Sequence, residues 1–317
     1  MRPSIFVLIL CAISAAVAPA RAEFPVKPIK LIIPFGAGGG SDGFARVIQA
    51  AIEKHELLPM PLVVVNADGA SGAVGTRQVL AANPDGYTIL QIHQEMFAAS
   101  VSGRVEYGPD DLEPIIQAAR SCEFLAVHKS SSFADLQQLL DYAKDNPGKL
   151  KQAGDIGSSS HFLSAKLMSL SGVRWAIVPT GGTSKRFASL LGGFTDLALM
   201  SSPWLERGKN DLRPLAALGE ERFPEAPDLP TATELGFDVS GCLIRRYWAP
   251  KGTPREVVDT IADAIEAAMT TDEVKAHLAN SREESSVLRG EKLKEAISAE
   301  YQEYVEVLPL VKETSGK

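Results

Sequence analysis

Residues 32–46 read IIPFGAGGGSDGFAR, a short apolar run that leads into a cluster of glycines and then into helix-forming residues. Glycine lets the backbone approach a ligand closely, and the helix that follows offers unpaired N–H groups and the positive end of a dipole. The stretch therefore predicts a strand, a turn that binds an anion, and a helix. The alternative is a turn that only connects the two elements, with Ser41 or Asp42 as the helix N-cap.

The same order of elements recurs along the chain. Strands that alternate with helices predict a parallel α/β sheet, and near-continuous apolar strands indicate burial on both faces. Residues 112–129 read as extended segments, and a helical tail is expected after Pro254, which suits a first helical turn. The other strand-like runs are 29–35, 62–66, 87–92, 150–154, 175–179 and 195–201.

A second turn of this kind, AGDIGSSSH at 153–161, also opens a predicted helix. Two α/β units that face each other with such turns would form a cleft. For the serines the alternative is N-capping of that helix. For His161 a surface or hinge contact is the alternative to a functional role.

The N-terminus is typical of an export signal. Arg2 precedes an apolar run, and Ala20-Arg21-Ala22 fits a cleavage site, so we expect a signal peptide of residues 1–22. A membrane anchor or a buried helix is the alternative. Cleavage would change the net charge from −7 to −9, because two arginines and no acids are removed. This balance argues against a general affinity for nucleic acid or anionic membranes.

Two cysteines remain in the mature chain, Cys122 and Cys242. An even count in an oxidising compartment is compatible with a disulfide, and two buried thiols are the alternative. About 295 residues exceed what one core usually organises, so we expect two domains.

Motifs for catalysis and cofactors are weak. Gly38, Gly40 and Gly43 formally match a dinucleotide fingerprint, but Asp42 would then lie beside a pyrophosphate that is already negative. No G-x-S-x-G elbow or H-E-x-x-H motif is present, and the histidines lack metal-ligand spacing. We therefore expect no enzyme activity, no cofactor and no metal.

Basic residues stand within an apolar run in SGCLIRRYWAP, residues 240–250. Charged residues in a strand either point to solvent or meet an anion. Because side chains alternate along a strand, only one of Arg245 and Arg246 can face a cleft. Lys185 and Arg186, in the helix after residue 182, are interpreted as a solvated face.

Several stretches together resemble one family, the periplasmic substrate-binding receptors of tripartite tricarboxylate transporters, also called the Bug family. Their order and spacing match across the mature chain. The matching stretches are PIKLIIPFGAGGGSDGFAR, VVVNADGASGAVGTRQVLAANPDGYTIL, AGDIGSSSH, LLGGFTDLALM, APDLPTATELGF and APKGTP.

The resemblance implies a two-lobe, Venus-flytrap α/β fold with two crossing strands. Lobe one would comprise residues 23–122 and 243–317, and lobe two residues 123–242. It also implies a monomeric periplasmic receptor that closes on a small organic carboxylate and delivers it to integral-membrane permease subunits. A ligand sensor for a signalling partner, or an exported enzyme that uses the glycine-rich turns as an anion site, are the alternatives.

The resemblance also implies ligand-binding residues. Cys122 and Cys242 fall near the lobe-crossing segments, where a bond could limit hinge motion. The ligand-binding residues are Phe35, Gly36, Gly38, Gly39, Ser41 and Asp42 in lobe one, and Gly157, Ser158, Ser159, His161 and Thr183 in lobe two.

Three departures from the family pattern suggest a shifted specificity. Residues 179–182 read PTGG where the family usually has Pro-Tyr-Lys-Gly, and Asp155 replaces a glycine. Arg245 and Arg246 stand where an aromatic residue and a glycine are usual. We therefore expect a ligand with a second anionic group that Arg245 or Arg246 binds, unless Asp155 pairs with an arginine and alters the carboxylate site.

Overall fold

The structure is a computed structural model that describes residues 24–223 and 226–315. The predicted signal peptide, residues 1–22, lies outside the described residues. The strands are β1 Ile29–Ile33, β2 Leu62–Asn66, β3 Thr88–Ile92, β4 Leu112–His128, β5 Lys151–Gly154, β6 Ala176–Pro179, β7 Leu197–Ser201, β8 Leu212–Ala217, β9 Cys242–Pro250 and β10 Glu284–Leu288.

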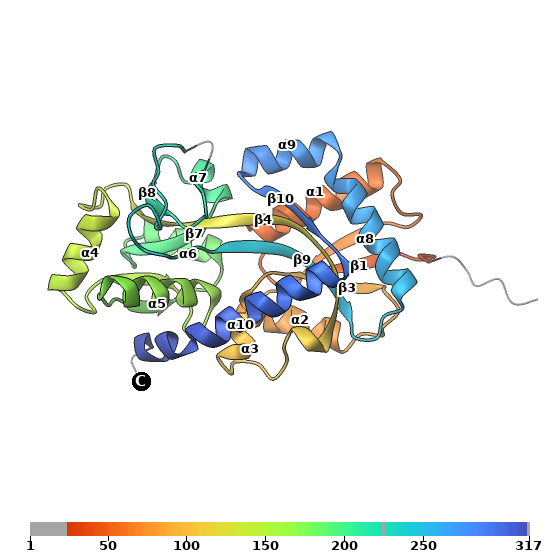
Figure 1. Cartoon of the computed structure of the whole chain (residues 1–317). Coiled ribbons are helices and arrows are strands. Elements are labelled where there is room, and N and C mark those ends of the chain that lie inside the picture. The colour runs from red at the N-terminus through yellow and green to blue at the C-terminus, as the bar shows by residue number, and fades with distance from the viewer. Residues whose placement is uncertain (1–23, 224–225, 316–317) are drawn as a thin grey trace, which may run out of the picture.

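Helices flank the sheet on both sides, as Figure 1 shows. Within the described residues, no helix is both long enough and apolar enough to cross a membrane. The helices are α1 Gly40–Lys54, α2 Ala73–Leu80, α3 Glu95–Val101, α4 Leu136–Asp145, α5 Ser159–Ser171, α6 Thr183–Leu191, α7 Pro203–Arg207, α8 Arg255–Met269, α9 Asp272–Ser281 and α10 Gly290–Thr314.

The described strands form one ten-stranded sheet that contains two parallel blocks. We call the block of β1, β2 and β3 the first half, and the block of β5, β6 and β7 the second half. Strands β4 and β9 run antiparallel to each other and connect the halves, and Figure 1 shows both of them crossing the molecule. Residues 112–129, expected as extended segments, form the single long strand β4 over Leu112–His128, which pairs first with β9 and then with β7.

Each half has its own apolar core. In the first half, the amphipathic helix α1 buries Phe44, Ile48 and Ile52, which lie on one face because they are four residues apart. In the second half, the core gathers around Leu139 and Leu197. Burial of each large apolar side chain contributes about 1.5–3 kcal/mol, so these faces fix how the helices pack on the sheet.

Two features connect the halves beside the crossing strands. Cys122 and Cys242 form a disulfide at the last residue pair between β4 and β9. Immediately beyond it, β4 pairs with β7, starting at Glu123. The helix α10 extends from the side of β3 to α5, as Figure 1 shows, and its Thr314 Oγ1 lies 2.9 Å from His161 Nε2. The disulfide thus marks the point where β4 passes from one half to the other.

Candidate functional site

A cavity of about 470 Å³ lies between the two halves. This volume is within the range of small-molecule sites in proteins. Many of the residues that the sequence predicts as ligand-binding line this cavity: Phe35, Gly36, Gly39, Ser41, Ser158, Ser159, Thr183 and Arg245. The structure therefore brings together residues from both glycine-rich turns and from strand β9.

The N-termini of three helices point into the cavity. They belong to α1, which begins at Gly40, α5, which begins at Ser159, and α6, which begins at Thr183. The first N–H groups of a helix have no partner within the helix, and the dipole adds positive potential there. The cavity is thus surrounded by groups that favour an anion, from both halves of the sheet.

Asp42 holds the turn before α1 in shape. Its carboxylate accepts hydrogen bonds from the Gly38 amide at 2.9 Å, from Asn66 Nδ2 at 2.9 Å and from Arg46 Nε at 3.0 Å. Burial opposes ionisation, but the bonds from Arg46, Gly38 and Asn66 outweigh it and lower the pKa of Asp42. Gly38 has a φ of +78°, which glycine adopts readily. Neither Asp42 nor Gly38 lines the cavity, so their structural role is to shape the turn.

Arg245 lines the cavity but is already bonded. Its Nη1 donates to Ser41 Oγ at 3.0 Å, and its Nε donates to Glu283 Oε1 at 3.2 Å. Burial tends to raise the pKa of Glu283, but the Arg245 charge and the His277 hydrogen bond outweigh it and lower that pKa. A Cβ at Gly40 would lie 2.9 Å from Arg245 Nη2, so glycine permits this close approach.

Arg246 lies on the other face of β9, as alternation along a strand requires. Its Nε donates to Gln117 Oε1 at 3.0 Å, and its guanidinium forms an ion pair with Glu300 and lies over the ring of Phe97. It does not line the cavity. Of the two adjacent arginines, only Arg245 is placed to meet a ligand there.

His161 and Gly157 support the turn before α5 rather than line the cavity. The fully buried His161 accepts a hydrogen bond from the Gly157 amide at its Nδ1, at 3.0 Å. Burial, with the Arg104 charge as a further cause, lowers the pKa of His161 to about 4. The Gly157 carbonyl accepts from Arg104 Nη2 at 2.8 Å, so this turn is tied to the first half.

The sequence did not single out His93, which lines the cavity. Its ring stacks on Phe35, with centroids 4.9 Å apart and planes 4° from parallel. Burial lowers its pKa to about 3, and Arg245 and Arg186 add to this shift. Nδ1 accepts from the Glu95 amide at 3.2 Å, so the neutral ring carries its proton on Nε2. His93 lies just after the carboxyl end of β3, and ligands in α/β sheets bind outside the carboxyl ends of the strands. This position could have predicted from the sequence that His93 lies at the cavity.

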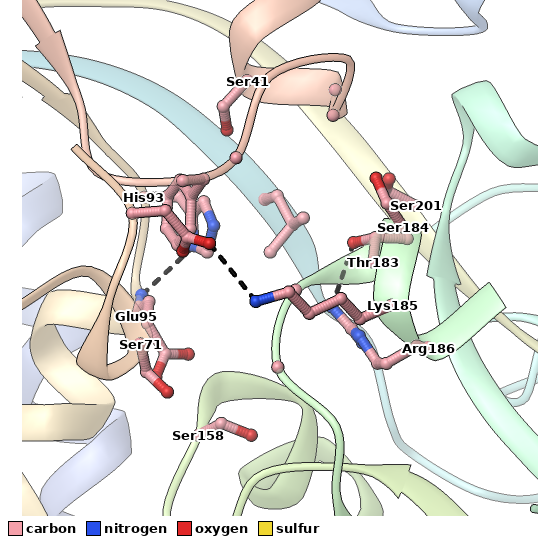
Figure 2. A pocket seen from close by; sticks show the side chains of 18 of the residues that line it. Ser41, Ser71, His93, Glu95, Ser158, Thr183, Ser184, Lys185, Arg186 and Ser201 are labelled. Carbon is pink, nitrogen blue, oxygen red and sulfur yellow. Dashed lines mark hydrogen bonds and ion pairs between the residues drawn. The ribbon is translucent and has the colours of Figure 1, made fainter. Parts of the chain in front are cut away.

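Lys185 and Arg186 were interpreted as a solvated face, which is wrong for Arg186. This side chain is only 8% exposed and lines the cavity, with Nη2 donating to Thr183 Oγ1 at 3.1 Å. Lys185 is exposed, and its Nζ lies 3.3 Å from Asp68 Oδ2 in the first half. Figure 2 shows Lys185 extending from α6 across the cavity.

Two acidic side chains accept hydrogen bonds from backbone amides of the second half. Asp155 accepts from the amides of Thr180 and Gly181, both at 3.2 Å, and from Ser71 Oγ at 2.9 Å. The alternative of an arginine partner for Asp155 is therefore not realised, because amides of the neighbouring turn and Ser71 supply the donors. Glu95, from α3, accepts from the amide of Ser159 at 2.9 Å.

Residues 44–306 match the sequence profile of the tripartite tricarboxylate transporter family receptor. The chain belongs to this receptor family. It is 33% identical to a UPF0065 protein of Cupriavidus necator, over 84% of this chain and 83% of the relative. It is 28% identical to protein BugT of Bordetella pertussis, over 84% of each chain.

Solved structures of similar receptors confirm the predicted two-lobe α/β fold. The periplasmic binding protein BugD is 27% identical, with a TM-score of 0.82 over 91% of this chain and 99% of BugD. MatC of Rhodopseudomonas palustris, solved with bound malate, is 28% identical, with a TM-score of 0.80 over 90% of this chain and 99% of MatC. A further R. palustris protein, solved with adipate, is 26% identical, with a TM-score of 0.82 over 92% of this chain and 99% of that protein.

The cavity of this receptor contains charges of both signs. Basic side chains come from both halves, namely Lys185, Arg186 and Arg245, while Asp68, Glu95 and Asp155 are acidic. Among the described residues, no group of three or more histidine, cysteine or acidic side chains could hold a metal ion. The arrangement suits reversible binding through hydrogen bonds and charge.

Proposed function

We propose that this receptor captures a small organic carboxylate between its two halves and delivers it to the membrane permease of a tripartite tricarboxylate-type transporter. The observation that carries the proposal is the convergence of helix N-termini from both halves on one cavity. A carboxylate bound there would accept hydrogen bonds from backbone N–H groups of α1 and α6. It would also face the ammonium of Lys185. The bonds to both halves would favour the closed arrangement.

The organisation of the chain supports this mechanism. We propose lobes of residues 23–122 with 243–317 and of residues 123–242, because β4 leaves β9 at Cys122. We also propose that the receptor works in the periplasm as a monomer after removal of residues 1–22, which agrees with the location of its relatives. The same ligand must bind the closed arrangement better than the open one for closure to follow binding.

A ligand screen tests the proposal directly. The mature protein would be heated with mono-, di- and tricarboxylates, aromatic acids and amino acids, and positive compounds would be confirmed by calorimetric titration. A ligand that binds only the native state stabilises it by about 2.7 kcal/mol at a hundredfold excess over Kd. We expect a carboxylate to raise the melting temperature and to be recovered unchanged. The proposal fails if no acid binds, or if the bound compound is consumed.

A variant of the anion-binding turn locates the binding. Gly39 lines the cavity with a φ of −73° and a ψ of 172°, a conformation that a branched residue can adopt. Gly39→Val should therefore fold but obstruct the α1 amides and weaken binding by about tenfold or more. The exposed Val63→Thr, on the same half, should leave Kd unchanged. Equal Kd values for both variants would place the ligand elsewhere.

A further inference from the structure

The carboxylate of Glu95 lies at the N-terminus of α5, although Glu95 belongs to α3 on the other half. Its Oε2 accepts hydrogen bonds from the Ser159 amide at 2.9 Å and from Ser159 Oγ at 3.1 Å. Its Oε1 accepts from Arg104 Nη2 at 2.6 Å. Glu95 is 5% exposed and lines the cavity. A carboxylate of the receptor itself therefore already occupies the position at the N-terminus of α5 where an anion would bind.

A second acid restricts the neighbouring turn in the same way. Asp155 uses the amides of Thr180 and Gly181, in the turn that precedes α6. The donors at the N-terminus of α6, which begins at Thr183, remain for a ligand, and the ammonium of Lys185 is shared with Asp68 of the first half. Two of the anion-binding positions in this half are thus filled by the protein itself.

Resting on the function proposed above, we propose that Glu95 determines specificity by acting as an internal carboxylate. It fills the position at α5, so the cavity binds one ligand carboxylate, between α1 and α6. A second carboxylate near α5 would meet the like charge of Glu95 and would find the Ser159 donors in use. The ligand class is therefore a monocarboxylate whose other end is uncharged or donates hydrogen bonds, in place of the second anionic group expected from the sequence, because Arg245 and Arg246 are already paired with Glu283 and Glu300.

Matched ligand pairs and matched variants test this assignment. Butyrate with succinate, and hexanoate with adipate, differ within each pair only by the second carboxylate. Calorimetric titration would give the ratio of dicarboxylate to monocarboxylate affinity for the mature wild type, Glu95→Ala, Glu95→Gln and Glu106→Gln. Glu106 is an exposed residue of the same half, paired with Arg77 outside the cavity, and is the control.

We expect the wild type to favour the monocarboxylate of a pair. Glu95→Ala should raise the dicarboxylate ratio by at least about tenfold, because it removes the charge and frees the Ser159 donors. Glu95→Gln should raise it less, because its amide oxygen still accepts from Ser159. Glu106→Gln should match the wild type. Thermal unfolding would show which variants are folded, and Glu95→Gln decides the question if Glu95→Ala is not.

The outcomes separate this inference from the proposed function. If the wild type binds these acids and both Glu95 variants show the same dicarboxylate to monocarboxylate ratio as the wild type, the specificity role is overturned. The receptor function then still stands. A wild-type preference for the dicarboxylate that persists in both variants would overturn the role equally. If none of the four proteins binds any carboxylate, including those of the wider screen, the proposed function fails, and this inference fails with it.

Discussion

Arg245 of β9 forms a buried ion pair with Glu283, at the segment that leads into β10. The Arg245 side chain is 2% exposed and that of Glu283 is 0% exposed. The same guanidinium donates to Ser41 Oγ, so the pair connects the first turn of α1 to the interior of the first half. This arrangement makes Arg245 a structural support of the turn as well as part of the cavity wall.

Replacement of Arg245 should destabilise the fold. Arg245→Ala breaks the buried pair and leaves Glu283 with only its contact to His277, and removing one partner of a buried pair costs about 3–5 kcal/mol. The exposed Arg255→Ala should cost less than about 1 kcal/mol, because its ion pair with Asp259 is at the surface. Urea denaturation of both variants measures the difference. Equal unfolding free energies would show that the buried pair contributes little.

The disulfide should contribute strongly to stability, because Cys122 and Cys242 are 120 residues apart in sequence. A bond that closes a loop of this length lowers the chain entropy of the unfolded state and thereby stabilises the folded protein by about 4–5 kcal/mol. Reductant should therefore lower the free energy of unfolding of the wild type by up to about this amount. The double variant Cys122→Ser with Cys242→Ser should not respond to reductant. Finding two free thiols in the unfolded, unreduced protein would contradict the bond.

Stability should fall as the pH falls below about 6.5. His93 and His161 have pKa values of about 3 and about 4 in the folded protein, against 6.5 for an ordinary histidine. Below pH 6.5 the unfolded chain binds protons at these positions and the folded protein does not, so their contribution is complete above 6.5 and is lost toward pH 4 for His161 and toward pH 3 for His93. Each histidine adds a slope of up to about 1.4 kcal/mol per pH unit.

Denaturant unfolding at pH 7, 6 and 5 measures this slope. His161→Asn should reduce it, because asparagine does not titrate and its side-chain oxygen can still accept from the Gly157 amide. His93→Gln should reduce it independently. A slope that neither substitution changes would mean that other groups cause the acid sensitivity.

Asp42 should control how well the first turn binds a ligand. Asp42→Ala removes the acceptor for the Gly38 amide and for Asn66 Nδ2, so the turn before α1 loses its fixed shape. We expect a loss of stability of about 1–3 kcal/mol and a Kd for the carboxylate at least about tenfold higher. Asp141→Ala, in the exposed face of α4, is the control and should change neither quantity. An unchanged Kd in Asp42→Ala would show that the turn does not need this support.

Features that depend on near neighbours could be predicted from the sequence. The strand, turn and helix of residues 32–46, and the amphipathic face of α1, follow from glycine and apolar periodicity, although the N-cap is Gly39 and not Ser41 or Asp42. Alternation along β9 correctly required that only one of Arg245 and Arg246 face the cavity. The partners of those arginines, Glu283 and Glu300, could not be predicted, because no local pattern connects residues so far apart in the chain.

The sequence by itself determined the α/β elements, the two glycine-rich turns and the resemblance to a receptor family, because these depend on local chemistry and on order along the chain. Only the tertiary structure decided which side chains bond to the amides at the cavity. Glu95 reaches Ser159 across 64 positions of sequence because the crossing strands bring α3 against α5. The electrostatics of the cavity are set by these long-range pairs, since a charge acts on whatever folding places within a few ångströms of it.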